Sequence, residues 1–198
     1  GVSIERTEDH YVKLLTSALQ QVADLPEARL RLARYYRDAH ARAEAADDRR
    51  EAARMEARLQ TFDDGSHAEW LQGDGTLTVV TEPAGATARL FRYETRDRRL
   101  VPVAVGEDMV TPIRDLSLKM GSYLVVLEHP DRQQVRYPVW MPRCHRWSGR
   151  PPDAEGPQPI VLPARGSLER SDRLVPAGWC MVGDVDRRRG ALARNWLW

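Results

Sequence analysis

The spacing of apolar residues changes once along this chain of 198 residues, at Gly73-Asp74-Gly75. Before this point apolar residues recur every three to four positions, which predicts amphipathic helices, and after it they alternate with polar residues, which predicts strands. One segment cannot satisfy both periods, so we expect a helical region over residues 1–73 and an antiparallel β domain over 74–145. The expected fold class is therefore α+β.

Four helices are expected in the first region, and the short loops between them favour antiparallel neighbours. Thr7 is the expected N-cap of the first helix, and Pro26 should open the second because proline fits a first helical turn. Asp48 and Ser66 each precede a glutamate by three residues, which is the spacing of a capping box. The residues expected to face a shared core are Tyr11, Leu14, Leu15, Ala18, Leu19, Val22, Ala28, Leu32, Tyr35, Tyr36, Ala39, Ala43, Ala52, Met55, Leu59 and Phe62.

About six short strands, with turns roughly every ten residues, predict a small antiparallel sandwich or barrel in the second region. Pro102 places its strand at an edge or bulge, because proline lacks a ladder donor. Residues 146–165 are rich in proline and glycine and predict an extended linker, within which 160–162 has the pattern of an added strand. The strand before this linker should turn four side chains to one face, namely Val135, Tyr137, Val139 and Met141.

Composition excludes several classes of function. The formal net charge is +1, which gives no field suited to nucleic acid or an anionic membrane. No apolar run approaches the ~20 residues that span a bilayer. Two cysteines, Cys144 and Cys180, form no metal-binding or redox motif, and such sparse use suits a reducing, cytoplasmic compartment.

The sequence also lacks a constellation for catalysis, for a cofactor or for a metal. Its five histidines do not have the helical spacing that places two metal ligands on one face. The carboxylate pairs at 47–48 and 63–64 lie at helix boundaries, where capping explains them. Cys180 is expected to pack as a small hydrophobe. We therefore expect no catalytic, cofactor-binding or metal-binding residues, and no enzyme activity in this chain.

Two groups of aromatic residues have alternative interpretations. Tyr35, Tyr36 and Trp70 would form either a peptide-binding face or, as is more common, internal packing. Trp140 and Trp147, with the charged loop at 96–99, would supply stacking and charge to a carbohydrate or peptide ligand. These alternatives stay open at the level of sequence.

Several motifs carry resemblances to known families. Leu32-Ala33 and Tyr36, followed by small residues, resemble the large-small packing of tetratricopeptide repeats. The β region is similar to bacterial PEGA domains, although alanine replaces the glutamate of the family's tetrapeptide. The matching segments are Gly75-Thr-Leu-Thr-Val79, Thr81-Glu-Pro-Ala-Gly-Ala86, Thr111-Pro112, Leu118 ahead of Gly121, Ser122-Tyr123 and Arg136-Tyr-Pro-Val139.

The region 166–198 resembles the start of a formylglycine-generating-enzyme (sulfatase-modifying-factor) domain. The resemblance is carried by Val175-Pro-Ala-Gly-Trp179, Met181-Val-Gly-Asp184 and Trp196-Leu-Trp198. The cysteines and metal-binding residues of that family would lie beyond this sequence. The three tryptophans should therefore be buried against the β domain or a partner, or else form an exposed apolar patch.

The order of these parts is similar to the middle of a group of bacterial serine/threonine protein kinases that end in a formylglycine-generating-enzyme-like domain. The resemblance implies a non-catalytic interdomain region that acts through protein contacts. A β module that binds a ligand or the cell wall is one alternative. A compact, stand-alone interaction domain whose C-terminal segment folds back on the β domain is the other.

Overall fold

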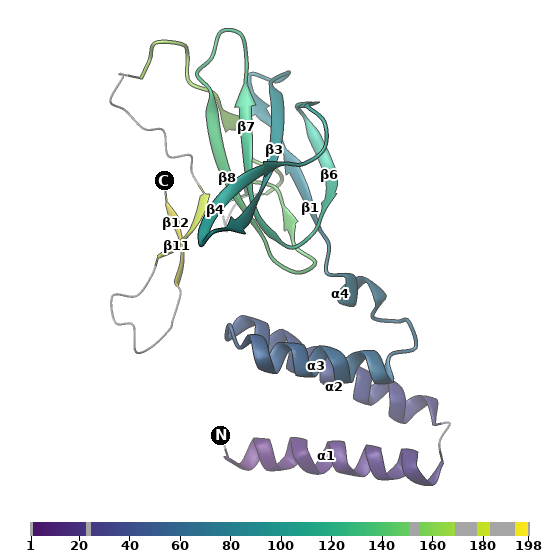
Figure 1. Ribbon diagram of the computed structural model, residues 1–198. Coiled ribbons are helices and arrows are strands. Elements are labelled where there is room, and N and C mark those ends of the chain that lie inside the picture. The colour runs from purple at the N-terminus through teal and green to yellow at the C-terminus, as the bar shows by residue number, and fades with distance from the viewer. Residues whose placement is uncertain (1, 23–24, 151–154, 169–177, 183–192, 198) are drawn as a thin grey trace. The chain divides into compact units, whose positions relative to one another are not determined.

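The computed structural model describes residues 2–22, 25–150, 155–168, 178–182 and 193–197, with side chains for 10–22, 25–150 and 155–168 (Figure 1). It divides into two compact units, residues 1–72 and 73–198. The first is helical and the second is built of strands, so the chain is mixed α and β, and its described residues form four helices and several antiparallel sheets. No helix in the described part of the chain is long and apolar enough to cross a membrane.

The helical unit is built around a pair of packed helices, α2 and α3. The four helices are α1 (Val2–Gln21), α2 (Pro26–Ala45), α3 (Arg49–Phe62) and α4 (Ala68–Gln72). Leu32 of α2 and Leu59 of α3 are completely buried in the shared core. Pro26 occupies the first turn of α2, as the sequence predicts. The prediction of Thr7 as an N-cap is wrong, because α1 begins at Val2 and no glycine or proline interrupts it before Thr7.

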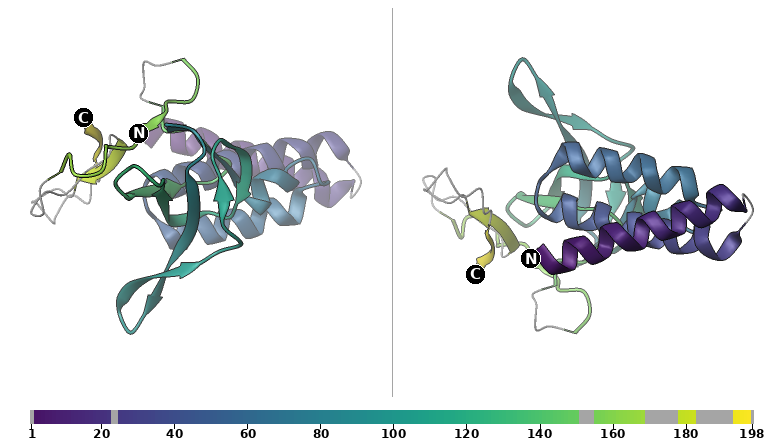
Figure 2. Two further views of the ribbon diagram at one scale, coloured as in Figure 1. Left: turned by 90° about the horizontal axis from the view of Figure 1, so that it is seen from above. Right: turned by 90° about the horizontal axis from the view of Figure 1, so that it is seen from below.

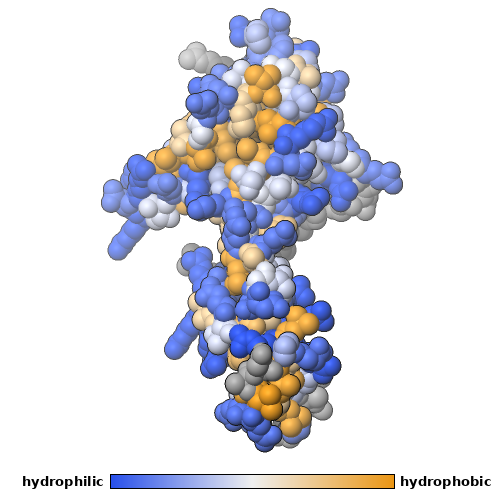
Figure 3. All heavy atoms as spheres, turned by 90° about the vertical axis from the view of Figure 1, so that its right-hand side faces the viewer, coloured by the Kyte–Doolittle hydropathy of each residue, from blue (hydrophilic) through white to orange (hydrophobic). Residues whose placement is uncertain are grey.

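The apolar stripe expected on α1 is divided between the core and the surface. Leu15 and Leu19 pack against the core of the unit. Tyr11, Leu14 and Val22 are 39%, 57% and 51% exposed, so the prediction that they face the core is wrong. The physical reason is that α1 packs on α2 along one side only, which is too narrow a contact to cover the whole stripe. Hydrophobic side chains accordingly reach the surface at the lower end of Figure 3, where α1 lies.

The aromatic residues of the helical unit pack with one another. Tyr36 stacks on Phe62 with ring centroids 5.6 Å apart, and Tyr35 meets Tyr36 edge-on at 5.3 Å. Tyr36 is 7% exposed, and Tyr35 and Trp70 are partly buried against the same cluster. These three residues therefore serve internal packing and do not form an open peptide-binding face.

Carboxylates hold the turns between the helices. The side chain of Asp48 accepts a hydrogen bond from the backbone N–H of Glu51 at 3.0 Å, which confirms it as the N-cap of α3. The turn before α4 is organised by Asp63 and not by Ser66, whose predicted capping role is wrong. The carboxylate of Asp63 directly follows α3 and accepts from the backbone N–H groups of Gly65 and His67, each at 3.1 Å. The backbone N–H of Ala68, which a Ser66 cap could have bound, donates instead to the carbonyl of Gly65 at 3.2 Å.

The described residues of the β unit form four sheets. The largest has the order β4 (Arg99–Ala104), β3 (Thr87–Arg96), β7 (Gly121–Glu128) and β8 (Val135–Met141), and β5 (Met109–Val110) also pairs with β3. A second sheet has the order β6 (Ile113–Leu118), β1 (Gly75–Val79) and β9 (Arg146–Trp147). The two remaining pairs are β10 (Ile160–Val161) with β2 (Thr81–Glu82), and β11 (Gly178–Val182) with β12 (Ala193–Leu197). The β3–β4 hairpin extends beyond the body of its sheet (Figure 2).

The core of the β unit lies between the two larger sheets. The inward side chains of β8 are the four that the alternation predicts, and each is at most 4% exposed. Burial raises the pKa of the Tyr137 hydroxyl to about 12. Pro102 lies in β4, an edge strand as predicted, and Pro138 lies in the opposite edge strand, β8.

Two buried threonines join the turn after β2 to the segment between β5 and β6. The hydroxyls of Thr81 and Thr111 are 2.5 Å apart, and the Thr81 hydroxyl also donates to the carbonyl of Pro83 at 2.8 Å. Since that hydrogen of Thr81 is used, Thr111 donates to Thr81 and accepts from the backbone N–H of Ala86 at 3.0 Å. The peptide bonds before Pro83 and Pro112 are both cis.

Residues 146–165, the expected linker, contribute to the β unit at both ends. Trp147 belongs to β9, which pairs with β1. Near the other end β10 pairs in parallel with β2, which confirms the strand expected at 160–162. Ile160 and Leu162 are 7% and 0% exposed in the core. Burial of their apolar side chains stabilises this segment against the β unit. Between β9 and β10, the described residues 148–150 and 155–159 form neither helix nor strand.

Candidate binding surface

The described residues bring together no arrangement suited to catalysis or metal binding. No group of three or more histidine, cysteine, aspartate or glutamate residues among them could hold a metal ion. Cys144 is exposed, in the turn after β8. Cys180 lies in β11, and its side chain is outside the described residues, as are those of Trp179, Trp196 and Trp198.

Ser66, His67 and Asp63 form a cluster that resembles a catalytic triad only in composition. Asp63 Oδ1 lies 2.8 Å from Nδ1 of His67, and the Ser66 hydroxyl lies 3.0 Å from the same Nδ1. In a catalytic triad the serine and the carboxylate contact different ring nitrogens. Burial alone would raise the pKa of Asp63, but the hydrogen bonds from the His67 side chain and from the backbone of His67 and Gly65 lower it overall. The cluster therefore stabilises a turn.

The two tryptophans considered for ligand stacking lie in different environments. Trp147 packs edge-on against the buried Tyr137 at 5.3 Å, so it is part of the internal packing. Trp140 is 48% exposed and points to the other side of β8. The charged loop at 96–99 is the tip of the β3–β4 hairpin. Of the two indoles, only that of Trp140 is available to a partner.

The central strand β7 is apolar on both of its faces. Tyr123, Val125 and Leu127 point into the core. Leu124 and Val126 point to the opposite face, yet they are only 4% and 6% exposed. Other side chains must cover them on this outer face, because both are nearly inaccessible to solvent.

The side chains beside Leu124 form an apolar area on this outer face. Phe91 lies opposite Leu124 on one side, and Pro138 lies opposite Leu124 on the other. Tyr93 and Trp140 occupy the next positions outward along their strands, two residues from Phe91 and Pro138. We call these five residues the aromatic face: Phe91, Tyr93, Leu124, Pro138 and Trp140.

The other half of the same sheet face is basic. Arg89 and Arg136 lie on either side of Val126, one step along the strands from the aromatic face. Arg89 forms an ion pair with Glu128, whose carboxylate also accepts from the side-chain amide of Gln134 at 2.6 Å. Arg136 is exposed. The carboxylate of Glu128 is thus already paired.

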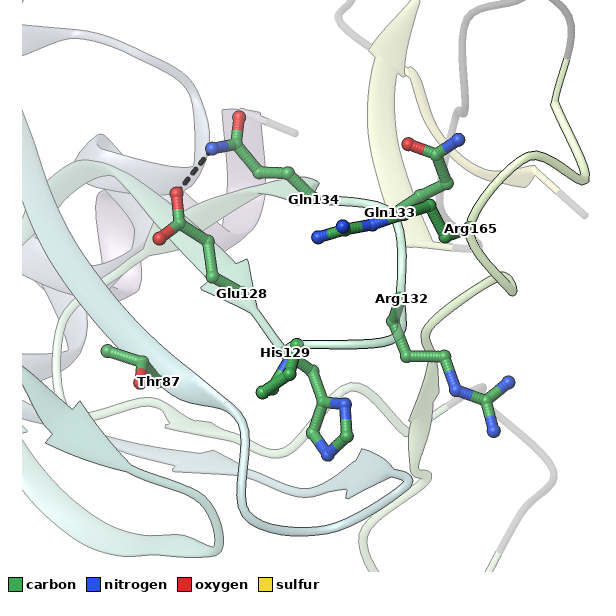
Figure 4. A pocket seen from close by; sticks show the side chains of 8 residues that line it. Thr87, Glu128, His129, Arg132, Gln133, Gln134 and Arg165 are labelled. Atoms are coloured by element: carbon green, nitrogen blue, oxygen red, sulfur yellow. Dashed lines mark hydrogen bonds between the residues drawn. The ribbon is translucent and has the colours of Figure 1, made fainter.

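A polar hollow of about 460 Å³ continues the face beyond Glu128 (Figure 4). Thr87 and Glu128 lie on one side of it, and Arg132, Gln133 and Arg165 lie on the other. Backbone hydrogen bonds hold the two segments of its wall together, from Gln133 to the carbonyl of residue 163 at 2.8 Å and from Arg165 to that of residue 131 at 3.2 Å. The remaining lining residues are His129, Pro130 and Gln134.

The basic end is defined by four arginines: Arg89, Arg132, Arg136 and Arg165. Within the part of the chain that the structure describes, no carboxylate pairs with Arg132, Arg136 or Arg165. The side chain of Arg132 donates to the carbonyl of Leu162, at 3.4 Å. The basic end therefore carries an excess of positive charge on a protein whose formal net charge is only +1.

Reasoning from the sequence identified Trp140 but missed the rest of this surface. One signal was present: residues 123–127 form a continuous apolar run, which is typical of a strand that is apolar on both faces. No comparable signal marks the basic end, since Arg89, Arg132, Arg136 and Arg165 are scattered among 28 arginines and meet only through strand register and the return of residues 160–165.

Comparisons with known proteins do not assign the chain to a family. No protein-family model, no curated protein and no solved structure matches it.

Proposed function

We propose that this chain is a non-catalytic, cytoplasmic protein-binding region that couples or spaces the kinase and formylglycine-generating-enzyme-like domains of a bacterial serine/threonine protein kinase. The observation that supports protein binding is the aromatic face, where Trp140 is 48% exposed on the same side of the sheet as Phe91, Tyr93 and Pro138. Aromatic side chains are enriched in the centres of protein interfaces, where each buries a large area at little cost in conformational entropy. The kinase context rests on the resemblance in module order.

The proposal treats the TPR-like and PEGA-like parts as two positioning units. The exposed side of α1, with Tyr11, Leu14 and Val22, gives the helical unit an apolar surface of its own. The β unit offers the aromatic face, so each unit has an area for a separate contact. Two such contacts within one chain would raise the effective concentration of one partner domain near the other.

Binding to a carbohydrate or to the cell wall has less support. A carbohydrate site commonly presents converging aromatic rings with a few polar groups, and here Trp147 is packed away from Trp140. The polar hollow has two open arginines but no exposed aromatic ring among its lining residues.

The test begins with the gene that encodes this sequence, which should specify a kinase domain before it and a formylglycine-generating-enzyme-like domain after it. Surface plasmon resonance between this chain and each separately produced domain should show binding that Trp140→Glu abolishes. Val161→Glu is the matched control, since Val161 is 64% exposed on β10, outside the aromatic face. The absence of both domains from the gene, or binding equal in the two variants, would contradict the proposal.

A further inference from the structure

We infer that the outer face of the large sheet binds a protein segment that carries large apolar side chains followed, about four residues away, by a cluster of acidic residues. This inference rests on the proposed protein-binding function and specifies the chemistry of the partner. It follows from three properties of one continuous surface: the aromatic face, the basic end and the distance between them.

The first property is that the apolar and basic parts lie on the same strands. On β7, Leu124 belongs to the aromatic face and Glu128 borders the polar hollow. On β8, Pro138 belongs to the aromatic face and Arg136, two residues earlier, belongs to the basic end. A ligand laid along these strands therefore meets apolar side chains first and arginines next.

The second property is the charge of the basic end. Glu128, the carboxylate that lines the hollow, is already engaged by Arg89 and Gln134. A second carboxylate, Asp131, is next to Arg132 in sequence. Arginine forms planar, bidentate contacts with carboxylates, so Arg132, Arg136 and Arg165 can each receive an acidic side chain. Figure 4 shows the guanidinium of Arg132 pointing away from the Glu128–Gln134 pair, so Glu128 does not pair with it. An acidic segment complements this area, whereas a basic segment would be repelled.

The third property is the spacing. A strand rises about 3.3 Å per residue, so the side chains of Leu124 and Glu128 are roughly 13 Å apart along β7. An extended peptide covers this distance in about four residues. An acidic residue two positions from the apolar anchor would reach Arg89 and Arg136, and one about four positions away would reach the hollow with Arg132 and Arg165.

The experiment selects ligands from a displayed library of random peptides of about twelve residues, using the intact chain as bait and the Trp140→Glu variant to remove unrelated binders. We expect the selected peptides to combine large apolar residues with Asp or Glu about two to five positions away. A synthetic peptide of the selected sequence should bind about tenfold more weakly when its acidic residues are changed to Gln or Asn. Its affinity should also fall when the NaCl concentration is raised from about 50 to 500 mM.

Variants of the chain test whether the basic end causes the preference for acidic peptides. Arg136→Gln with Arg165→Gln should weaken binding of that synthetic peptide about tenfold. Arg114→Gln is the matched control, because Arg114 is an exposed arginine on β6 in the other large sheet. Thermal melts of all variants establish that each is folded.

The outcomes separate this inference from the function on which it rests. Selected peptides without an excess of acidic residues, or binding unchanged by the double variant, would overturn the inference and leave protein binding at the aromatic face intact. Selection that yields no peptide dependent on Trp140 would overturn both. Trp140-dependent binding of polygalacturonate, an anionic glycan, in the absence of peptide binding would overturn both as well and favour a carbohydrate ligand.

Discussion

The indole N–H of Trp70 donates a hydrogen bond to Nδ1 of His40 at 3.0 Å, which joins the short helix α4 to the buried side of α2. His40 is 1% exposed, and its other ring nitrogen lies 3.7 Å from Glu44 and 3.8 Å from Glu56. Because Nδ1 is the acceptor, the ring proton of neutral His40 must be on Nε2, toward the two carboxylates. This relationship fixes both the tautomer of the histidine and the position of Trp70.

Replacement of Trp70 by phenylalanine should therefore destabilise the helical unit. Trp70→Phe keeps an aromatic ring but removes the donor to a buried nitrogen, and we expect the free energy of unfolding to fall by about 1–3 kcal/mol. Urea denaturation of the full chain, followed by circular dichroism at a helical wavelength, measures this. Trp140→Phe is the control, because an exposed position should change stability by less than about 0.5 kcal/mol. Equal unfolding midpoints for the two variants would contradict the prediction.

The paired hydroxyls of Thr81 and Thr111 should stabilise the β unit by an amount similar to that of the Trp70–His40 hydrogen bond in the helical unit. Thr111→Val preserves side-chain shape but leaves the backbone N–H of Ala86 and the hydroxyl oxygen of Thr81 short of a partner. We expect a loss of about 1–3 kcal/mol in the free energy of unfolding. Thr95→Val makes the same change at an exposed position on β3 and serves as the control. An unchanged stability in Thr111→Val would show that these hydroxyls contribute nothing measurable.

The lowered pKa of Asp63 predicts a dependence of stability on acid. A carboxyl whose pKa is lower in the folded state stabilises that state above its unfolded pKa, and the contribution is lost as the pH falls through the folded value. The free energy of unfolding should thus decline as the pH drops below about 4. Asp63→Asn should flatten this decline, whereas Asp97→Asn, in the exposed β3–β4 turn, should keep it. Parallel curves for wild type and Asp63→Asn would refute this role.

Burial of Tyr137 predicts an ultraviolet titration at unusually high pH. Burial raises the pKa of the Tyr137 hydroxyl to about 12, so this phenol should ionise at a higher pH than a tyrosine of ordinary pKa. Tyr137→Phe should remove the late step in absorbance near 295 nm, where phenolate absorbs, about two pH units above the ordinary value near 10. Since the folded pKa is raised, the native state loses stability as the pH rises from the unfolded value through the folded one. Tyr11→Phe, which removes an exposed phenol, should leave the late step in place.

The sequence predicts elements where the local chemistry is sufficient to define them. Pro26 at the start of α2, the Asp48 cap and the inward residues of β8 follow from turn chemistry and periodicity, and each is confirmed. The start of α1 was predicted wrongly because Thr7 has the residue type of a cap but lies in a segment with no helix breaker. The exposure of Leu14 could not be foreseen, because it depends on how little of α1 its neighbour covers.

The candidate surface was largely beyond prediction for a similar reason. Phe91, Leu124 and Pro138 are far apart in sequence, and only the register of β3, β7 and β8 makes them neighbours. The burial of His40, in contrast, could be predicted from the sequence, since His40 lies four residues after Tyr36 and three before Ala43 on the buried side of α2. A polar residue in that pattern was a recognisable signal of a buried, hydrogen-bonded side chain.

The prolines in both edge strands of the large sheet limit how this protein can be recognised. Pro102 in β4 and Pro138 in β8 each remove a backbone donor from a strand that would otherwise be open to a further strand. The sheet therefore resists the addition of a further β-strand at either edge, whether the strand comes from another protein or from a second copy of this chain. Changes of binding preference can then accumulate through side-chain replacements on the outer face, while the hydrogen-bonded framework beneath them stays the same.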